Sequence, residues 1–339
     1  MDDLLVLRWL AKMSCLISAP AHQLIGKKTV EMKLNPLRIF LAIVDSGSQH
    51  AAARALGVTQ PAVTKALQRL EADLDVRLFD RSVHGAELTE YGQALLTRAR
   101  LIDAELKSCI EALDQIKGQQ RGSISIAVSH LPGTLLLPKV LHVFRRKWPD
   151  VNLRVAASAY PFLLPQVREG SLDFAIAPAP ITSWPEDLIR EPLMATRLSP
   201  VVRRGHHLAE TRSLEALAAA EWVLPTQESA SAQALQAAAQ RLGLQPPICR
   251  LTCETFTAMI MTVATSELIG LIPSEMVPNI ATLAGVVEVP IEDRLKGAEL
   301  CLIRRRAGVL TPAAAALAAD FTSAARRLAR EPRADDSQR

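Results

Sequence analysis

The stretch GSQHAAARALGVTQPAVTKALQRLEADL, residues 47–74, predicts two short helices joined by a tight turn. Ser48 can cap the first helix with its hydroxyl, and Gly57 supplies a backbone position with φ > 0 that ends this helix. Thr59 can cap the second helix, and Pro61 falls in its first turn, where a missing N–H costs nothing. The second helix carries one apolar face at helical spacing, which consists of Val63, Leu67, Leu70 and Leu74.

The opposite face of the second helix is polar and carries no carboxylate. Its members are Pro61, Thr64, Lys65 and Gln68, and the charged residues from position 47 to 70 are Arg54, Lys65 and Arg69. A short helix that is rich in donors, and is locked by a turn onto another helix, suits the major groove of DNA. The pattern therefore predicts a helix-turn-helix motif, from Gln49 to Gln68, that binds duplex DNA.

Three segments carry a resemblance to a known family. They are AAARALGVTQPAVTKALQRLE (residues 51–71), LFDR (residues 78–81) and LTEYGQALLTRAR (residues 88–100). Together they make residues 33 to about 100 similar to the LysR-type transcriptional regulators. The resemblance implies an α/β protein: an N-terminal winged helix-turn-helix, a long linker helix and a C-terminal effector domain. That domain would have two Rossmann-like subdomains, as in periplasmic binding proteins.

Seven side chains are candidates for contacts with DNA: Gln60, Pro61, Thr64, Lys65, Gln68, Arg69 and Arg81. Gln60 and Thr64 would read base edges, and Pro61 would touch a thymine methyl group. Lys65 and Arg69 would hold phosphates or base edges. We expect broad loss of affinity when Lys65 is truncated and loss of site discrimination when Gln60 is truncated.

Two further elements complete the predicted DNA-binding domain. Residues 35–45 predict its first helix, which Gly47 ends. Residues 78–88 predict a two-stranded wing with a turn near His84 and Gly85. Arg81 on this wing would reach a phosphate or the minor groove. The alternative for Arg81 is an ion pair with one of the neighbouring acids, Asp80 or Glu87.

A long helix is expected from Thr89, with a sustained heptad seam. The seam consists of Leu95, Ala99, Ile102, Leu106, Cys109, Leu113 and Ile116. Such a stripe needs a partner helix, which the resemblance gives as the same helix of a second copy. Packing onto its own chain is the alternative. Two copies would also place two recognition helices one turn of DNA apart, so a homodimer or homotetramer is expected. A hinge follows at residues 117–122.

From residue 122 onward, strands and helices alternate, which predicts a parallel sheet. The expected plan is an extension at residues 1–31, a DNA-binding domain at 32–89, a linker at 90–121 and an effector domain at 122–329. The effector domain divides into a first subdomain, about 123–195 with 285–329, and a second, about 196–284. Met32 would be a natural start, and residues 330–339 a disordered tail.

Ligands of parallel α/β sheets bind beyond the carboxyl ends of strands. The side chains expected there are Ser129, His130, Tyr160, Thr226, Gln227, Glu254 and Thr255. The family and the helix N-termini favour a small organic anion as the effector, and no cofactor or metal is expected. Simple helix capping is the alternative role for Ser129, Thr226 and Thr255. His206 and His207, in a GHHLA segment where the family commonly has Gly-His-Pro-Leu-Ala, are expected in a surface turn.

Composition restricts the remaining possibilities. Apolar residues make up 49% and charged residues 22%, which is typical of soluble domains, and the formal net charge is +4. No segment has the length and apolarity of a membrane span. The five cysteines show neither a disulfide framework nor zinc spacing, so free, buried thiols in the cytoplasm are expected. RNA polymerase is a further candidate partner.

Two other functions compete with a regulator that an effector controls. One is a thiol-dependent hydrolase that uses Cys253, although the following Glu254 would raise the thiol pKa rather than lower it. No serine-triad elbow, metal motif or glycine-rich phosphate loop supports enzyme chemistry. The other is an architectural DNA-binding protein without an effector, which leaves the C-terminal half unexplained. The sequence therefore predicts a regulator and not an enzyme.

Overall fold

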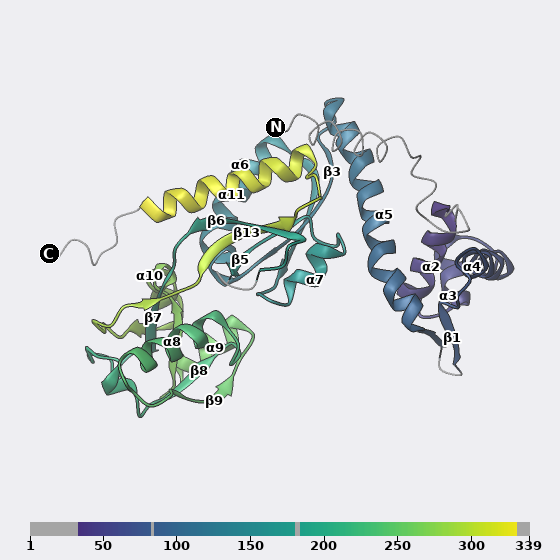
Figure 1. The fold of residues 1–339 in the computed structure, drawn as a ribbon. Coiled ribbons are helices and arrows are strands. Elements are labelled where there is room, and N and C mark those ends of the chain that lie inside the picture. Colours follow the sequence, from purple (N-terminus) through teal and green to yellow (C-terminus); the bar gives the residue numbers. More distant parts are fainter. Residues whose placement is uncertain (1–32, 83–84, 180–183, 331–339) are drawn as a thin grey trace, which may run out of the picture. The chain divides into compact units, whose positions relative to one another are not determined.

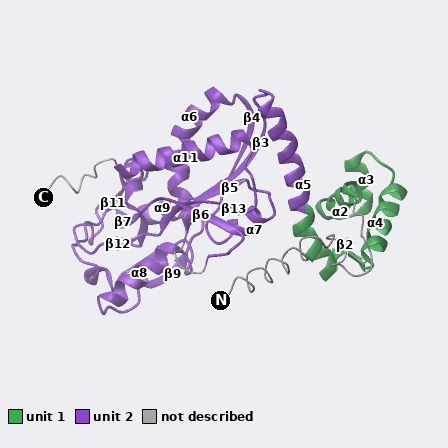
Figure 2. Cartoon of the chain, turned by 45° about the horizontal axis from the view of Figure 1, so that its top comes forward, with its two compact units in different colours: residues 1–99 green, residues 100–339 purple. Residues whose placement is uncertain are grey.

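The computed structural model describes residues 33–82, 85–179 and 184–330 of the 339-residue chain. The chain forms two compact units, residues 1–99 and 100–339 (Figure 2). Each unit is considered by itself. The expected extension at residues 1–31, the start at Met32, the wing turn at His84 and the tail beyond Arg330 lie outside the described residues.

Unit 1 contains the predicted three helices, α2 (Leu34–Ser46), α3 (Gln49–Leu56) and α4 (Gln60–Leu74). The hydroxyl of Ser48 accepts the N–H of Ala51 at 3.1 Å, so this predicted cap is confirmed. Gly57 ends α3 with φ of 66°, a left-handed conformation that favours glycine. The buried residues of the three helices form a common core, which includes Leu37, Phe40, Ile43, Ala52, Val63, Leu67 and Leu70.

The predicted side-chain cap at Thr59 is wrong. Thr59 occupies the N-cap position of α4, but its side chain makes no capping hydrogen bond. Capping side chains accept from the second or third amide of a helix, and Pro61, the second residue, has no N–H. The third amide, that of Ala62, donates to the carbonyl of Thr59 at 3.1 Å instead.

The wing and the long helix also form as predicted. Strands β1 (Phe79–Ser82) and β2 (Gly85–Leu88) pair antiparallel. The N–H of Ala86 in β2 donates to the carbonyl of Gly47 at 3.2 Å, which ties the wing to the turn before α3. Helix α5 (Glu90–Ile116) continues for 27 residues, from the end of unit 1 into the start of unit 2.

Unit 2 contains two sheets (Figure 1). The first has the order β4–β3–β5–β13–β6. Its strands are β3 (Arg121–Val128), β4 (Asp150–Ala157), β5 (Phe174–Ala179), β6 (Leu188–Met194) and β13 (Glu299–Arg305). Its helices are α6 (Leu137–Lys147), which a short π-helical segment precedes, α7 (Leu163–Arg168) and α11 (Pro312–Arg330). Helix α11 packs against α6, as Figure 1 shows.

The second sheet has the order β11–β7–β10–β8–β9, and β12 also pairs with β7. Its strands are β7 (Arg197–Arg203), β8 (Glu221–Leu224), β9 (Ile248–Thr252), β10 (Ile269–Pro273), β11 (Val286–Glu288) and β12 (Leu295–Lys296). The helices are α8 (Ala230–Arg241), α9 (Phe256–Ala264) and α10 (Val277–Ala284), besides 3-10 turns at residues 215–217 and 274–276.

The expected parallel arrangement holds for three adjacent strands of each sheet. Strands β4, β3 and β5 run parallel, and so do β9, β8 and β10. Strands β13 and β7 run antiparallel to their neighbours. These two strands follow connections that come directly from the other sheet, without a crossover helix, so nothing forces them into the parallel direction.

The return to the first sheet comes later than the predicted position near Gly285. Strands β11 and β12 still pair with β7, and the chain joins the first sheet only at β13. The hydroxyl of Thr196 donates to the carbonyl of Ala298 at 2.6 Å, so both crossovers run side by side. A Cβ at Gly297 would lie 2.2 Å from the Oγ1 of Thr196, which only glycine avoids. Within the described ranges, no helix is both long and apolar enough to cross a bilayer.

Candidate functional site

The predicted DNA-contact residues of α4 form one exposed surface, called here the reader face: Gln60, Pro61, Thr64, Lys65, Gln68 and Arg69. All are exposed except Thr64, which is half-buried. Val63, Leu67 and Leu70 hold the opposite side of the helix in the core, with exposed fractions of at most 4%. The reader face is therefore free to meet a partner.

Polar contacts within unit 1 hold two of these side chains. The hydroxyl of Thr64 donates to the Oε1 of Gln49 at 2.8 Å. The Oε1 of Gln60 lies 3.3 Å from the Nδ1 of His50. Both partners belong to the first turn of α3. Lys65, by contrast, is exposed, and no described carboxylate pairs with it, so its charge is available to a phosphate.

Acidic side chains mark where the reader face stops. Arg69 lies 4.0 Å from Asp73 one turn later, and both side chains are largely exposed. A hollow of about 580 Å³ follows between α4 and the wing, and carboxylates line it beside Thr64 and Gln68; they are those of Glu71, Asp75 and Asp80. These acids would repel a DNA backbone. The carboxylates therefore limit the reader face at its C-terminal end, at Gln68 and Arg69.

Arg81 lies in β1, opposite Ala86 of β2. Its side chain is outside the described part of the structure. The choice between a DNA contact and an ion pair for Arg81 stays a prediction.

The seven side chains expected at the carboxyl ends of strands are called here the strand-end cluster. Ser129 and His130 follow β3, Tyr160 follows β4, Thr226 and Gln227 follow β8, and Glu254 and Thr255 follow β9. The structure brings only some of them close to the other sheet. His130 stacks on the ring of Phe256 in α9, with 4.8 Å between ring centroids. This contact joins the loop after β3 to a helix of the second sheet.

Ser129 is buried beside this contact. Its hydroxyl has no hydrogen-bond partner among the described residues, and its exposed fraction is 7%. The backbone N–H of Ser129 donates to the carbonyl of Ile176 at 2.9 Å, which holds the main chain at this position. Burial lowers the pKa of His130. This shift favours the neutral form of His130.

The other members of the strand-end cluster are placed differently. Tyr160 stacks on Trp184, with 6.2 Å between ring centroids, and belongs to the first sheet's own core. The carbonyl of Thr226 accepts the hydroxyl of Ser229 at 2.7 Å. Gln227, Glu254 and Thr255 are exposed, and Thr255 precedes α9 without a side-chain cap. Phe256 and Trp184 were missed, although aromatic residues make up only 4% of the sequence and each was therefore notable.

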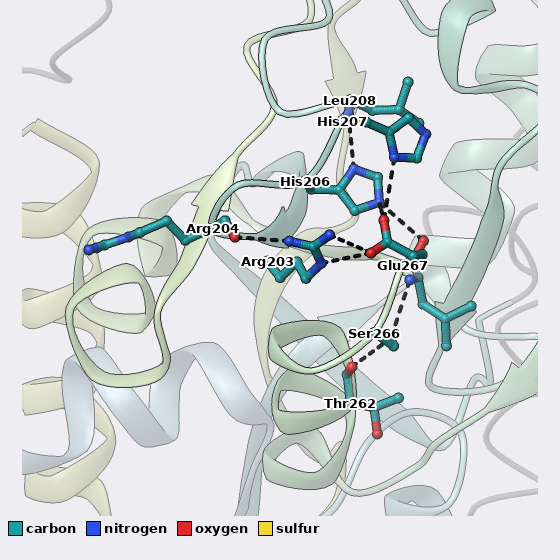
Figure 3. A network of polar contacts seen from close by, with 9 residues as sticks. Arg203, Arg204, His206, His207, Leu208, Thr262, Ser266 and Glu267 are labelled. Carbon is teal, nitrogen blue, oxygen red and sulfur yellow. Dashed lines mark hydrogen bonds and ion pairs between the residues drawn. The ribbon is translucent and has the colours of Figure 1, made fainter.

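The expectation that both histidines of the GHHLA segment lie on the surface is wrong for His206 (Figure 3). Its Nδ1 accepts the N–H of Leu208 at 3.0 Å, so the ring proton sits on Nε2, which lies 3.1 Å from a carboxylate oxygen of Glu267. Arg203 also binds Glu267, and its hydrogen bond is the main cause that lowers the pKa of this carboxyl. His207 is exposed, 3.4 Å from Glu267. With both nitrogens of His206 engaged, the group clamps a turn rather than presenting open metal ligands.

The described cysteines only partly match the expectation of buried thiols. Cys301 is buried, and desolvation raises its pKa to about 11. Cys109 on α5 is exposed, while Cys249 and Cys253 are half-buried. The thiol of Cys253 donates to the carbonyl of Thr255 at 3.5 Å, and no hydrogen bond joins it to a histidine among the described residues. The geometry therefore gives no support to a thiol nucleophile.

The predicted seam of α5 is partly covered by its own chain. Ala99 is fully buried, whereas Leu113 and Ile116 are 53% and 73% exposed. Within unit 2, polar contacts join the later part of α5 to β13 and α11: Glu105 accepts from Arg305 at 2.7 Å, and Gln115 accepts the N–H of Ala313 at 2.9 Å. The end of the seam thus stays open to a partner helix.

Comparisons with known proteins agree with both units. Residues 34–93 match the family model described as bacterial regulatory helix-turn-helix protein, lysR family, and residues 117–326 match the LysR substrate binding domain. The HTH-type transcriptional regulator TdcA of Escherichia coli is 27% identical over 271 residues, 80% of this chain and 86% of TdcA. GbpR of Azospirillum brasilense is 32% identical over 219 residues, 64% of each chain.

Solved structures show the same fold. Full-length CbnR in complex with its target DNA has a TM-score of 0.63 at 21% identity, over 88% of this chain and all of CbnR. A full-length variant of OxyR from Pseudomonas aeruginosa has a TM-score of 0.64 at 18% identity, over 87% of this chain and 95% of OxyR. The family models together cover most of the sequence. The chain therefore belongs to the LysR family, as a transcriptional regulator with a DNA-binding helix-turn-helix domain and an effector-binding domain.

Proposed function

We propose that the reader face enters the major groove of operator DNA, where Gln60, Pro61 and Thr64 meet base edges and Lys65 meets a phosphate. The observation that carries this proposal is an exposed helix face free of carboxylates, with a central lysine that no described carboxylate pairs with. CbnR, whose structure contains its target DNA, shares the fold. The wing residue Arg81 and the helix residues Gln68 and Arg69 extend the contact.

Two copies would bind as a homodimer, or as a homotetramer built from dimers. The exposed end of the α5 seam, from Cys109 to Ile116, provides an apolar surface for a second copy. Dimerisation would present two reader faces to a palindromic operator. The regulator would work in the cytoplasm, without catalysing a reaction, and RNA polymerase is the partner through which it would act.

A small-molecule effector would occupy the strand-end cluster between the two sheets. The buried hydroxyl of Ser129, without a partner among the described residues, supports this position, because such a group gains a hydrogen bond when a ligand enters. Thr226, Gln227, Glu254 and Thr255 follow strands of the second sheet, and Tyr160 follows a strand of the first. Because burial favours the neutral form of His130, an anionic effector would be held by N–H donors rather than by a cation.

The DNA-binding role is tested by Lys65→Ala and Gln60→Ala in salt-titrated gel shifts. The probes are an operator, selected by the native protein from random duplexes, and a scrambled copy of it. Lys65→Ala should weaken binding to both duplexes and reduce the salt slope by about one. Gln60→Ala should weaken binding to the operator by about tenfold more than to the scrambled duplex.

Gln93→Ala serves as the matched control, because Gln93 is exposed on α5 within the same unit. Equal losses on the two duplexes for Gln60→Ala would contradict the reading role. An unchanged salt slope for Lys65→Ala would contradict the phosphate contact.

A further inference from the structure

The first turn of α3 reaches across to the reader face. Gln49 and His50 begin this helix, and neither residue is part of α4. Gln49 is half-buried and holds the hydroxyl of Thr64, while the exposed His50 lies beside the carboxamide oxygen of Gln60. The first contact decides which end of the Thr64 hydroxyl remains for DNA, and the second fixes the orientation in which Gln60 presents its carboxamide.

For Thr64, the contact uses up the donor. A hydroxyl has one hydrogen and two acceptor lone pairs, and this hydrogen points to the Oε1 of Gln49 at 2.8 Å. Thr64 then presents an acceptor and a methyl group to the groove. The acceptor fits the amino groups of adenine or cytosine, and the methyl group fits that of thymine. It does not fit a phosphate oxygen or a guanine edge, because these only accept.

For Gln60, the contact orients the carboxamide. A carboxamide oxygen cannot donate, so the Nδ1 of His50, 3.3 Å away, carries the proton of this pair. The oxygen has two lone pairs, so one of them stays open beside the two donors of the amide nitrogen. Both ends of Gln60 then remain for adenine, which glutamine binds in a bidentate manner, and the contact with His50 holds them in one orientation.

We infer that Gln49 and His50 are positioning residues that set the base preference of the recognition helix. Gln49 makes Thr64 an acceptor, and His50 holds the carboxamide of Gln60 in one orientation, which favours adenine. The inference rests on the proposed function, in which α4 enters the major groove. Neither residue needs to touch a base itself.

The experiment selects binding sites from a library of random duplexes with the full-length protein and its variants. His50→Leu should weaken the preference for adenine at the base pair read by Gln60 by about tenfold, because the carboxamide is then free to turn. His50→Asn should keep the native preference, because its amide can donate from nearly the same position. Gln49→Met should let the base pair read by Thr64 change from an amino-bearing base to an acceptor, and Gln49→Glu should keep the native preference.

Matched controls are Gln93→Met on α5 and His142→Leu on α6, both exposed and away from the reader face. Uniform weakening by His50→Leu and Gln49→Met, with an unchanged preferred site, would overturn the inference and leave merely structural roles. Gln60→Ala and Thr64→Ala distinguish a failure of this inference from a failure of the proposed function. If they alter the preferred site while the α3 variants do not, only this inference fails. If they do not alter it either, the proposed reading role of α4 fails.

Discussion

The reader face and the strand-end cluster differ in whether their polar side chains have hydrogen-bond partners. On the reader face, the hydroxyl of Thr64 and the carboxamide of Gln60 each have a partner on α3. In the strand-end cluster, the hydroxyl of Ser129 is buried without a partner among the described residues, and His130 has lost part of its solvation. A buried unsatisfied polar group costs about 1–3 kcal/mol. Thr64 and Gln60 are therefore partnered before DNA arrives, whereas the proposed effector would supply the partner that Ser129 lacks.

Truncation of Phe256 should have the largest effect: it should lower the stability of the strand-end cluster and leave DNA binding by the reader face unchanged. Phe256→Ala removes the half-buried ring that stacks on His130 and should lower the free energy of unfolding by about 2 kcal/mol. Urea unfolding followed by tryptophan fluorescence checks this result, because three of the four tryptophans, Trp148, Trp184 and Trp222, lie in unit 2. Binding of unit 1 to a scrambled duplex should not change.

The comparison for that experiment is Lys65→Ala, which should alter DNA binding and leave the unfolding curve within about 0.5 kcal/mol of the native one. If Phe256→Ala also left stability unchanged, the His130–Phe256 stack would not be a joint between the two sheets.

The same contrast explains how much the sequence could predict. The helices and wing of unit 1 depend on contacts between residues close in sequence, such as the cap at Ser48 and the left-handed Gly57, and these were predictable. The contacts of Gln49 and His50 with α4 were not predicted. Their donors and acceptors become visible only when the angle between α3 and α4 is known.

The strand-end cluster was predictable in position but not in assembly. Strand ends follow from alternating apolar segments, so each of the seven residues falls after its expected strand. The partner of His130, however, lies on a distant helix, and no periodicity reveals which ring it will meet. The boundary near Gly285 failed for a related reason. Strands β11 and β12 have only three and two residues, and backbone pairing with β7 defines them.

Removal of the Ser129 hydroxyl tests whether a buried polar group without a described partner lowers the stability of the strand-end cluster. Ser129→Ala should raise the free energy of unfolding by about 1 kcal/mol, because a buried polar group without a described partner is lost. The matched change Ser199→Ala should lower it by about the same amount, since buried Ser199 is bonded to Glu288 and lies 2.7 Å from the hydroxyl of Ser274. Urea unfolding measures both variants.

A ligand adds a second measurement to this pair of variants. In a thermal-shift screen of small metabolites against the full-length protein, a compound that stabilises the native protein should stabilise Ser129→Ala less and Ser199→Ala equally. A compound with equal shifts on all three proteins would bind elsewhere, and the strand-end cluster would lose its assignment.

The smallest expected effect concerns pH. Burial places the pKa of His130 in the folded protein below its ordinary value of about 6.5, so the unfolded chain binds more protons in that interval. The stabilising contribution is complete above about pH 6.5 and is lost as pH falls through the lower, folded pKa.

Buried Asp173 works in the opposite direction, because burial raises its pKa, and the folded state then gains protons as pH falls. A comparison of native protein with His130→Gln cancels Asp173 and isolates the histidine. Between about pH 7 and pH 5, the native protein should lose more stability in urea than His130→Gln does, and exposed His142→Gln should behave like the native protein. Parallel losses in all three proteins would mean that the stack on Phe256 does not disfavour a charged His130, and the contrast with the reader face would then rest on Ser129 alone.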